Sequence, residues 1–235
     1  MALPKQVAPS YTTVLPSNNE EVLFRPMTMK QQKSLLIALE SEDNMQMLRS
    51  MRELLASATD DQFDAMKAPM VDLEWLFLQV RAKSVGETVD LNLKCTQEEC
   101  NGSSKVSIDL TTVGIKRSDE HENHMIMLTE DLGLNMRYPT PEMLSKMQSD
   151  NELDQLTEVL KFTIVSIFDK LEVHHLEDAD TKEVEEFLDS LTMDQIRMIT
   201  DYFDRMPKLS HSIDTVCDAC GHKGQRVLEG IASFF

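Results

Sequence analysis

The spacing of hydrophobic positions along this chain switches between the period of strands and the period of helices. In residues 11–25, YTTVLPSNNEEVLFR, two short apolar runs lie on either side of a PSNNE turn, which predicts an N-terminal β-hairpin. Leucines and methionines then recur at helical intervals over residues 29–57, after Thr28 and Gln31, which have the spacing of a capping box. This pattern predicts one long helix, or two helices separated near ESEDN. Another helix is expected over residues 69–84, beginning at a proline.

From residue 85 the hydrophobic period changes to two. Apolar residues alternate before Cys95 and again after Cys100, so this cysteine pair lies at the tip of a predicted hairpin. The alternating positions are Val85, Val89, Leu91, Leu93, Val106, Ile108 and Leu110. Residues 125–138 alternate in the same way and predict a further hairpin. The last segment of the chain returns to alternation around Cys217 and Cys220.

A helical block separates these hairpins. Thr140 can cap a helix with Pro141 at its first position, and Thr192 with Gln195 has the spacing of a second capping box. The segment LDQLTEVLKFTIVSIFDK places its apolar residues on one helical face. Helices are therefore expected over residues 141–148, 152–170, 181–190 and 193–205. The pattern as a whole predicts an α+β fold, with no internal repeat, in which β-hairpins flank a helical block.

The same pattern divides the chain into consecutive segments that we expect to form one composite domain. With 235 residues, of which 41% are hydrophobic, the chain can supply a sizeable core. The segments are an N-terminal hairpin at 1–27, a helical segment at 28–84, a hairpin region with the first cysteine pair at 85–138, a helical block at 139–206, and a C-terminal cysteine hairpin and tail at 207–235.

Charge narrows the range of partners. The chain has 23 Lys and Arg against 41 Asp and Glu, a net charge of −18, which repels phosphate backbones and anionic lipid. We therefore expect neither nucleic acid nor membrane as a partner. No apolar stretch approaches the roughly 20 residues of a membrane helix, and the N-terminal sequence lacks the apolar centre of a secretory signal. We expect a soluble protein inside the cell.

The four cysteines suggest a metal site. Cys95 and Cys100 enclose four residues, and Cys217 and Cys220 enclose two. In a reducing cytosol such close pairs favour metal binding over disulfides, and four thiolates from two turns form the usual tetrahedral structural zinc site. A zinc ion at these positions forms a zinc-ribbon-like clip that joins the end of the chain to its middle. The alternatives are a vacant site, disulfides or redox chemistry, although a redox CxxC normally opens a helix rather than a hairpin.

Outside the cysteines, the sequence does not indicate a further metal site or a catalytic site. His222 follows the last cysteine and is expected to face solvent rather than bind the metal. His121 and His124 are expected in a solvated loop, and His174 with His175 in an acidic loop that leads into a helix. The sequence contains no phosphate-binding glycine loop, nucleophile elbow or zinc-protease motif, which argues against an enzyme.

Two further features bear on partner binding. The 16 methionines either fill irregular gaps in the core, which is the preferred interpretation, or lie on surfaces that adapt to a partner. The C-terminal IASFF either docks into the protein's own core or forms a hook for another protein. Docking is favoured, because a free apolar tail promotes aggregation.

The order of several segments resembles the baseplate hub assembly proteins of T4-like contractile-tailed phages. These segments are LPSNNEEVLFRPMTMKQQKSLLIALES, DLEWLFLQVRAKSVGETVDLNLKC, MRYPTPE and CDACGHKGQRVLEGIASFF. The resemblance spans nearly the whole chain. Its most specific parts are the LEWLFLQVRAKSVGE passage from helix to strand and the terminal cysteine turn followed by LEGIASFF.

The resemblance implies a small, non-enzymatic protein that helps to build the central hub of the baseplate. Its implied partners are hub and tape-measure proteins, and its implied location is the host cytoplasm during assembly or the baseplate of the virion. The alternative is a host-directed phage regulator that uses a zinc-ribbon module. Such a regulator needs a basic or aromatic patch near the cysteine turns, where only Lys223 and Arg226 supply positive charge.

Overall fold

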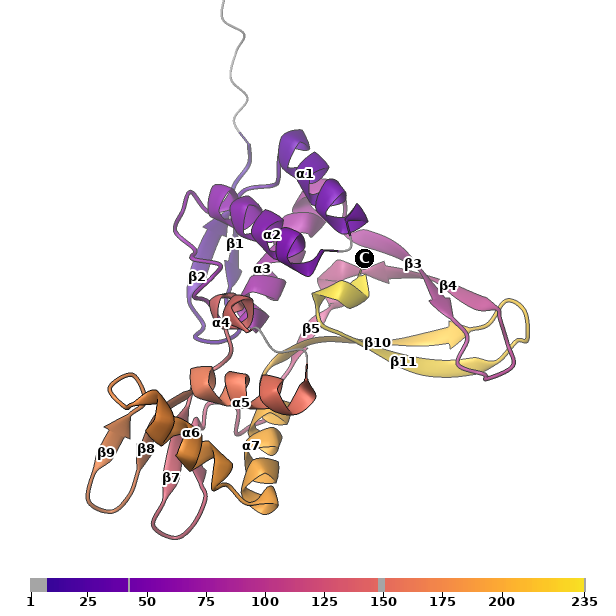
Figure 1. Cartoon of the computed structure of the whole chain (residues 1–235). Helices are drawn as coiled ribbons and strands as arrows, with labels where there is room; N and C mark the ends of the chain where they lie inside the picture. Colours follow the sequence, from indigo (N-terminus) through magenta and orange to yellow (C-terminus); the bar gives the residue numbers. More distant parts are fainter. Residues whose placement is uncertain (1–7, 42, 148–150, 235) are drawn as a thin grey trace, which may run out of the picture. The chain divides into compact units, whose positions relative to one another are not determined.

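The computed structural model describes residues 8–41, 43–147 and 151–234, and within this part of the chain it confirms the α+β class. The chain forms two compact units (Figure 1). Unit one contains the described residues up to Lys116 together with those from Lys208 onward, and unit two runs from Arg117 to Pro207. No helix among the described residues is long and apolar enough to cross a membrane.

Unit one begins with the predicted hairpin and three helices. The elements are β1 (Tyr11–Val14), β2 (Glu21–Phe24), α1 (Met29–Glu40), α2 (Asn44–Ala58) and α3 (Met70–Val85). The alternative with two helices in place of one long helix is therefore confirmed, and the Thr28–Gln31 capping box forms at the start of α1. Leu55, Leu76 and Phe77 are fully buried in the core between these helices and the hairpin.

A buried carboxylate connects the β1–β2 turn to α3. Asp72 is only 2% exposed, and its carboxylate accepts hydrogen bonds from the backbone N–H of Ser17 at 2.9 Å and from the Ser17 hydroxyl. Burial raises the pKa of Asp72, although both hydrogen bonds from Ser17 act in the opposite direction. The first turn of α3 also favours a negative charge at this position. These contacts fix the hairpin against the helix.

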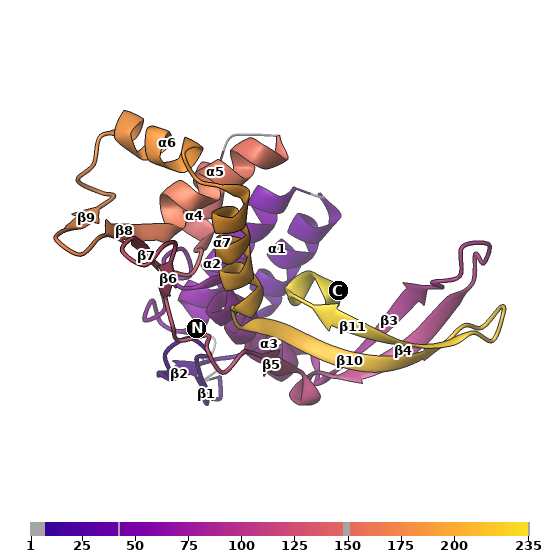
Figure 2. The ribbon, with the colours of Figure 1, turned by 90° about the horizontal axis from the view of Figure 1, so that it is seen from below.

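The second half of unit one consists of two β-hairpins and the C-terminus. The elements are β3 (Thr88–Lys94), β4 (Ser103–Asp109), η1 (Leu110–Thr112), β5 (Gly114–Lys116), β10 (Lys208–Val216), β11 (Lys223–Glu229) and η2 (Ile231–Phe234). The β3–β4 hairpin and the β10–β11 hairpin extend side by side toward their tips (Figure 2). At the base, β10 also pairs with β5, a strand that the hydrophobic pattern did not predict.

The C-terminal segment docks into the core of unit one, as the sequence predicted. Phe234 is fully buried with Leu78, Ile108 and Leu209. The backbone N–H of Ile231 donates a hydrogen bond to a Glu74 carboxylate oxygen at 3.3 Å, which fixes the start of η2 on α3. The C-terminal segment up to Phe234 is therefore part of the fold.

Unit two is an antiparallel sheet packed against helices. Its strands, in spatial order, are β6 (Met125–Met127), β7 (Gly133–Met136), β8 (Ile164–Phe168) and β9 (Val173–His175). Its helices are α4 (Pro141–Lys146), α5 (Glu152–Thr163), α6 (Thr181–Asp189) and α7 (Met193–Arg205). Leu134, Ile164, Ile199 and Tyr202 lie in its core. The predicted caps at Thr140 and Thr192 are both confirmed.

The predicted helix over residues 152–170 is wrong beyond Thr163. The chain leaves α5 there and forms β8, which pairs with β7 inside the sheet. The TIVSIF sequence fits a helical face, but its β-branched residues also suit a strand, and pairing with β7 decides between them. The predicted helix over 141–148 ends at Lys146, and its last predicted residue lies outside the described part of the chain.

Candidate metal centre

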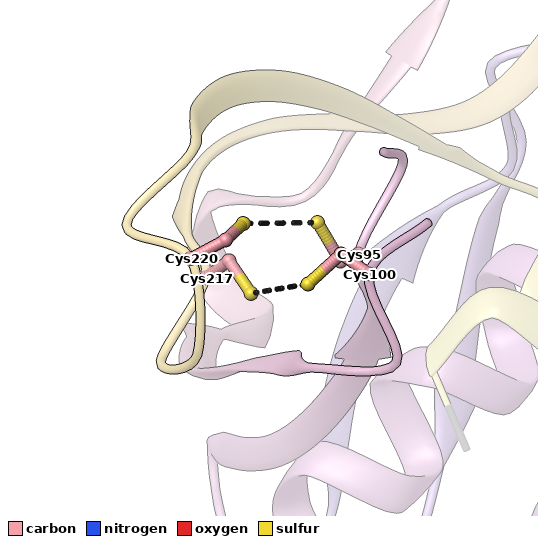
Figure 3. A group of neighbouring side chains, drawn as sticks. All are labelled: Cys95, Cys100, Cys217 and Cys220. Atoms are coloured by element: carbon pink, nitrogen blue, oxygen red, sulfur yellow. Dashed lines mark hydrogen bonds between the residues drawn. The ribbon is translucent and has the colours of Figure 1, made fainter. Parts of the chain in front are cut away.

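The four cysteines meet at the tips of the two long hairpins of unit one. Cys95 and Cys100 lie in the β3–β4 turn, and Cys217 and Cys220 lie in the β10–β11 turn (Figure 3). All four sulfur atoms lie within 4.8 Å of one another. The Sγ atoms of Cys95 and Cys220 are 3.8 Å apart, and those of Cys100 and Cys217 are 3.7 Å apart. The structure thus brings together every residue of the predicted site.

The two shorter separations, 3.8 and 3.7 Å, match the edges of a tetrahedral thiolate site. Four sulfurs at about 2.3 Å from a central zinc ion form a tetrahedron with edges of about 3.8 Å. A disulfide requires an S–S distance of about 2.05 Å, well below the distances here, and all four cysteines are free. The four sulfurs are therefore close enough together to hold one metal ion as thiolates.

Backbone hydrogen bonds build both turns around the sulfurs. The N–H of Cys95 donates to the carbonyl of Gly102, and the N–H of Cys217 donates to the carbonyl of His222, both at 2.9 Å. The amides of Gln97 and Gly102 point to the sulfurs of Cys95 and Cys100, at 3.5 and 3.3 Å. Such N–H groups stabilise negative charge on sulfur, so the turns are arranged for thiolates.

The two turns also contact each other directly. The N–H of Ser103 donates to the Asp218 carboxylate at 2.9 Å, and the N–H of Asp218 donates to the carbonyl of Ser103 at 2.9 Å. Further along the hairpins, the Arg226 guanidinium donates to the carbonyl of Lys94 at 3.0 Å. The sulfur cluster is therefore held by contacts between segments that are far apart in the sequence.

The thiols of the cluster differ in acidity. Backbone N–H groups of Cys220 and Ala219 lower the pKa of Cys217 to about 7. The Gly102 amide acts in the same direction on Cys100, but hydrogen bonding with the Cys220 thiol, together with desolvation, raises the pKa of Cys100 to about 12.

His222 lies beside the cluster but is not one of its potential ligands. Its ring nitrogens are both 3.3 Å from the side-chain nitrogen of Gln97, across the two turns. Within the described part of the chain, the group of residues close enough to share a metal consists of the four cysteines. The prediction that His222 is not a ligand agrees with this geometry, although its side chain is half-buried rather than fully exposed to solvent.

The prediction for His121 and His124 is correct in placing them in a loop, but wrong in describing that loop as solvated, because both side chains are half-buried. His124 Nδ1 lies 2.9 Å from the hydroxyl of Tyr202, and Tyr138 donates its hydroxyl proton to the backbone carbonyl of His121 at 2.6 Å. Burial lowers the pKa of His124, and the charge of His121 acts in the same direction. The aromatic partners come from distant positions, so the local pattern around HENH carried no signal for this packing.

His174 and His175 were predicted in an acidic loop, but they are exposed residues of the strand β9. They lie on the rim of a hollow of about 550 Å³ between the end of the sheet and α6. Among the described residues, the cysteine cluster is the one group of histidines, cysteines and carboxylates close enough to hold a metal ion.

Residues 8–235, nearly the whole chain, match a family model described as T4 bacteriophage base plate protein. No curated protein and no solved structure matches the chain.

Proposed function

The chain belongs to the T4 bacteriophage base plate protein family and is thus a structural component of a phage baseplate, and from this premise we propose that it is a non-enzymatic structural or chaperone component of hub assembly. In this role it binds hub or tape-measure proteins. It acts in the host cytoplasm while the tail is assembled, and either remains in the baseplate or leaves before the particle is complete.

The observation that carries this proposal is the cluster of four thiols at the hairpin tips. Cys95, Cys100, Cys217 and Cys220 together supply a full tetrahedral ligand set for zinc. A zinc ion held by four thiolates has no open position for water or substrate, so the metal supplies a cross-link rather than catalysis. The proposed site stabilises the long hairpins, which suits a protein whose task is to present surfaces to other proteins.

Exposed methionines support partner binding. Met29 on α1 is 87% exposed, Met193 and Met198 on α7 are 77% and 42% exposed, and Met125 and Met127 on β6 are 53% and 46% exposed. Methionine adapts its shape to a partner surface. We propose that the helices within residues 29–57 of unit one and those within residues 141–205 of unit two each present a partner-binding surface, with acidic positions around an apolar centre.

The regulator interpretation has weaker support. Of the cations near the cysteine turns, Arg226 donates a hydrogen bond to the carbonyl of Lys94 and so connects the two hairpins. The lysines nearest the turns in the sequence are Lys94 and Lys223, a small basic feature for a module that must recognise a host nucleic acid or an acidic protein.

Metal analysis tests the proposed site. Protein purified without chelator is expected to contain one zinc ion per chain, because the four thiolates form a single site. Cys220→Ser should remove the metal, and His222→Ala, a matched change in the same turn, should retain it. A metal-free preparation that is fully stable and has four titratable thiols would contradict the site.

Capture of tagged protein from infected cells, followed by mass spectrometry, tests the assembly role. Hub, tape-measure or other baseplate proteins are expected to co-purify. Mass spectrometry of purified virions then distinguishes a resident component from a departing chaperone. The assembly role is wrong if no tail protein is recovered at any stage of infection and particles assemble normally when the gene is silenced.

A further inference from the structure

An open sheet edge lies beside α7 in unit two. Strand β6 is the outer strand of the four-stranded sheet, and it contacts α7 (Figure 2). A groove of about 600 Å³ runs between them. We call it the β6–α7 groove; the lining residues that matter here are Met125, Ile126 and Met127 on the strand, and Met198, Asp201 and Asp204 on the helix.

The backbone of β6 is available along this edge. Toward β7, the carbonyl of His124 accepts from the N–H of Met136 at 2.8 Å, and the N–H of Leu128 donates to the carbonyl of Leu132 at 2.9 Å. Because bonding alternates along an antiparallel strand, Ile126 also faces β7, while the backbone groups of Met125 and Met127 face outward.

One of these outward groups is already bonded. The N–H of Met125 donates to the side-chain oxygen of Asn123 at 3.0 Å. The carbonyl of Met125 and both backbone groups of Met127 have no hydrogen-bond partner among the residues that the structure describes. An extended peptide beside β6 therefore has one donor and two acceptors to pair with.

The walls of the groove combine apolar surface with negative charge. Met125, Met127 and Met198 are each between 42% and 53% exposed. Asp201 and Asp204 are exposed on α7, and no described cation forms an ion pair with Asp201. Arg205 is the one cation lining the groove, and it pairs with Glu120 at 2.7 Å. The groove therefore favours a partner with apolar and basic residues.

We propose that the β6–α7 groove binds an extended segment of another protein, which adds to the sheet as a strand beside β6 and carries Lys or Arg opposite Ile126. Residues directly opposite each other in a sheet point to the same face, and Ile126 lies in the core cluster that includes Ile199 and Tyr202 of α7. A long basic side chain there packs its stem against Met198 and brings its charge to Asp201. Its neighbours in the segment are apolar and cover Met125 and Met127.

A second copy of the chain fits the groove less well. Each copy has a net charge of −18 and brings further carboxylates rather than a basic strand. That the occupant is a hub or tape-measure protein rests on the proposed function. The chemistry of the occupant, a strand with an apolar–basic–apolar sequence, rests on the groove alone.

Variants of the full chain distinguish the two proposed interactions, the charge contact with Asp201 and the backbone pairing along β6. Asp201→Lys reverses the charge in the groove, and Asp189→Lys makes the same change at an exposed position of α6 outside it. Met127→Pro removes an outward N–H without removing a bond to β7, and Met127→Leu keeps the backbone and an apolar side chain. Circular dichroism and thermal unfolding check that each variant folds. If Met127→Pro does not fold, the two lysine variants still test the proposal.

The probe is an array of overlapping synthetic peptides that cover the other tail proteins of the same phage. The wild-type chain is expected to bind peptides with alternating apolar residues and a central Lys or Arg. Asp201→Lys should weaken this binding about tenfold, since it replaces a charge-assisted contact by repulsion. Asp189→Lys and Met127→Leu should bind as the wild type does, and N-methylation of the central peptide amides should abolish binding.

The proposal is overturned if the wild type binds no such peptide, if Asp201→Lys behaves like Asp189→Lys, or if the bound peptides tolerate N-methylation. It is also overturned if the chain forms a dimer that Met127→Pro dissociates, since the occupant is then a second copy. If Asp201→Lys still co-purifies with tail proteins as well as the wild type, the groove proposal fails while the assembly role stands.

Discussion

Gly102 lies at a close approach between the two cysteine turns. A Cβ atom at this position would lie 2.5 Å from the Cβ of Ala219 and 2.7 Å from the sulfur of Cys217. Both distances are below normal contact, and neither neighbour can move without disturbing the sulfur cluster. The absence of a side chain at Gly102 therefore allows two distant turns to share one site.

Gly102→Ala is expected to destabilise unit one by about 2 kcal/mol, the typical cost of overpacking a tight contact, and to weaken metal binding. Thermal unfolding and competition with a chelator measure the two effects. The control is Gly114→Ala, because a Cβ there meets no atom within 4 Å and the backbone is not left-handed. Equal stability and equal metal affinity in both variants would show that the turns are not closely packed.

His124 is expected to make the stability of unit two depend on pH. Burial lowers its pKa in the folded state below the ordinary value of 6.5, so the unfolded chain takes up the proton first as the pH falls. The free energy of unfolding should therefore decrease as the pH falls from 6.5 toward the lower, folded-state pKa of His124, and this contribution should be constant above 6.5. Urea unfolding of the wild type and of His124→Gln measures it. The difference between the two proteins is expected to change with pH only within that window.

At the scale of elements, the sequence correctly predicted the helices and hairpins that are marked by a local sequence pattern. The capping boxes at Thr28 and Thr192 and the alternation around both cysteine pairs identified helix starts and hairpin tips correctly. Strand β8 was missed because TIVSIF fits both periods. Strand β5 was missed because its partner, β10, lies some 90 residues later in the chain. The packing of His124 against Tyr202 spans 78 residues and likewise had no local signal.

The docked C-terminal segment is expected to be a major contributor to the stability of unit one. Phe234→Ala removes a fully buried ring and should lower the free energy of unfolding by about 3–5 kcal/mol. Val227→Ala, on the neighbouring strand and 53% exposed before the change, should have a small effect. Denaturant unfolding compares the two variants. A small loss for Phe234→Ala would mean that the segment is not held in the core in solution.

At the scale of the whole molecule, the net charge of −18 is expected to govern how fast a partner is found. Complementary charge mainly speeds association, while buried apolar contacts set the rate of dissociation. Raising the salt concentration should therefore slow association with a baseplate partner more than it speeds dissociation. Surface plasmon resonance with a partner recovered from infected cells separates the two rates. If the association rate did not depend on salt, the acidic residues would not guide partner binding and would form only a solvated surface.

The pairing of Lys116 with Lys208 has a consequence for how this family can vary. These two residues bound unit two in the sequence, and as partners in neighbouring antiparallel strands their Cα atoms lie about 5 Å apart. The segment between them is thus an insertion that leaves unit one and returns to it at neighbouring positions. Evolution can lengthen, shorten or exchange such an insertion without altering the host fold around it. We therefore expect relatives to conserve the sulfur cluster and the docked terminus while they diversify the inserted segment, which lets one scaffold serve baseplates with different neighbours.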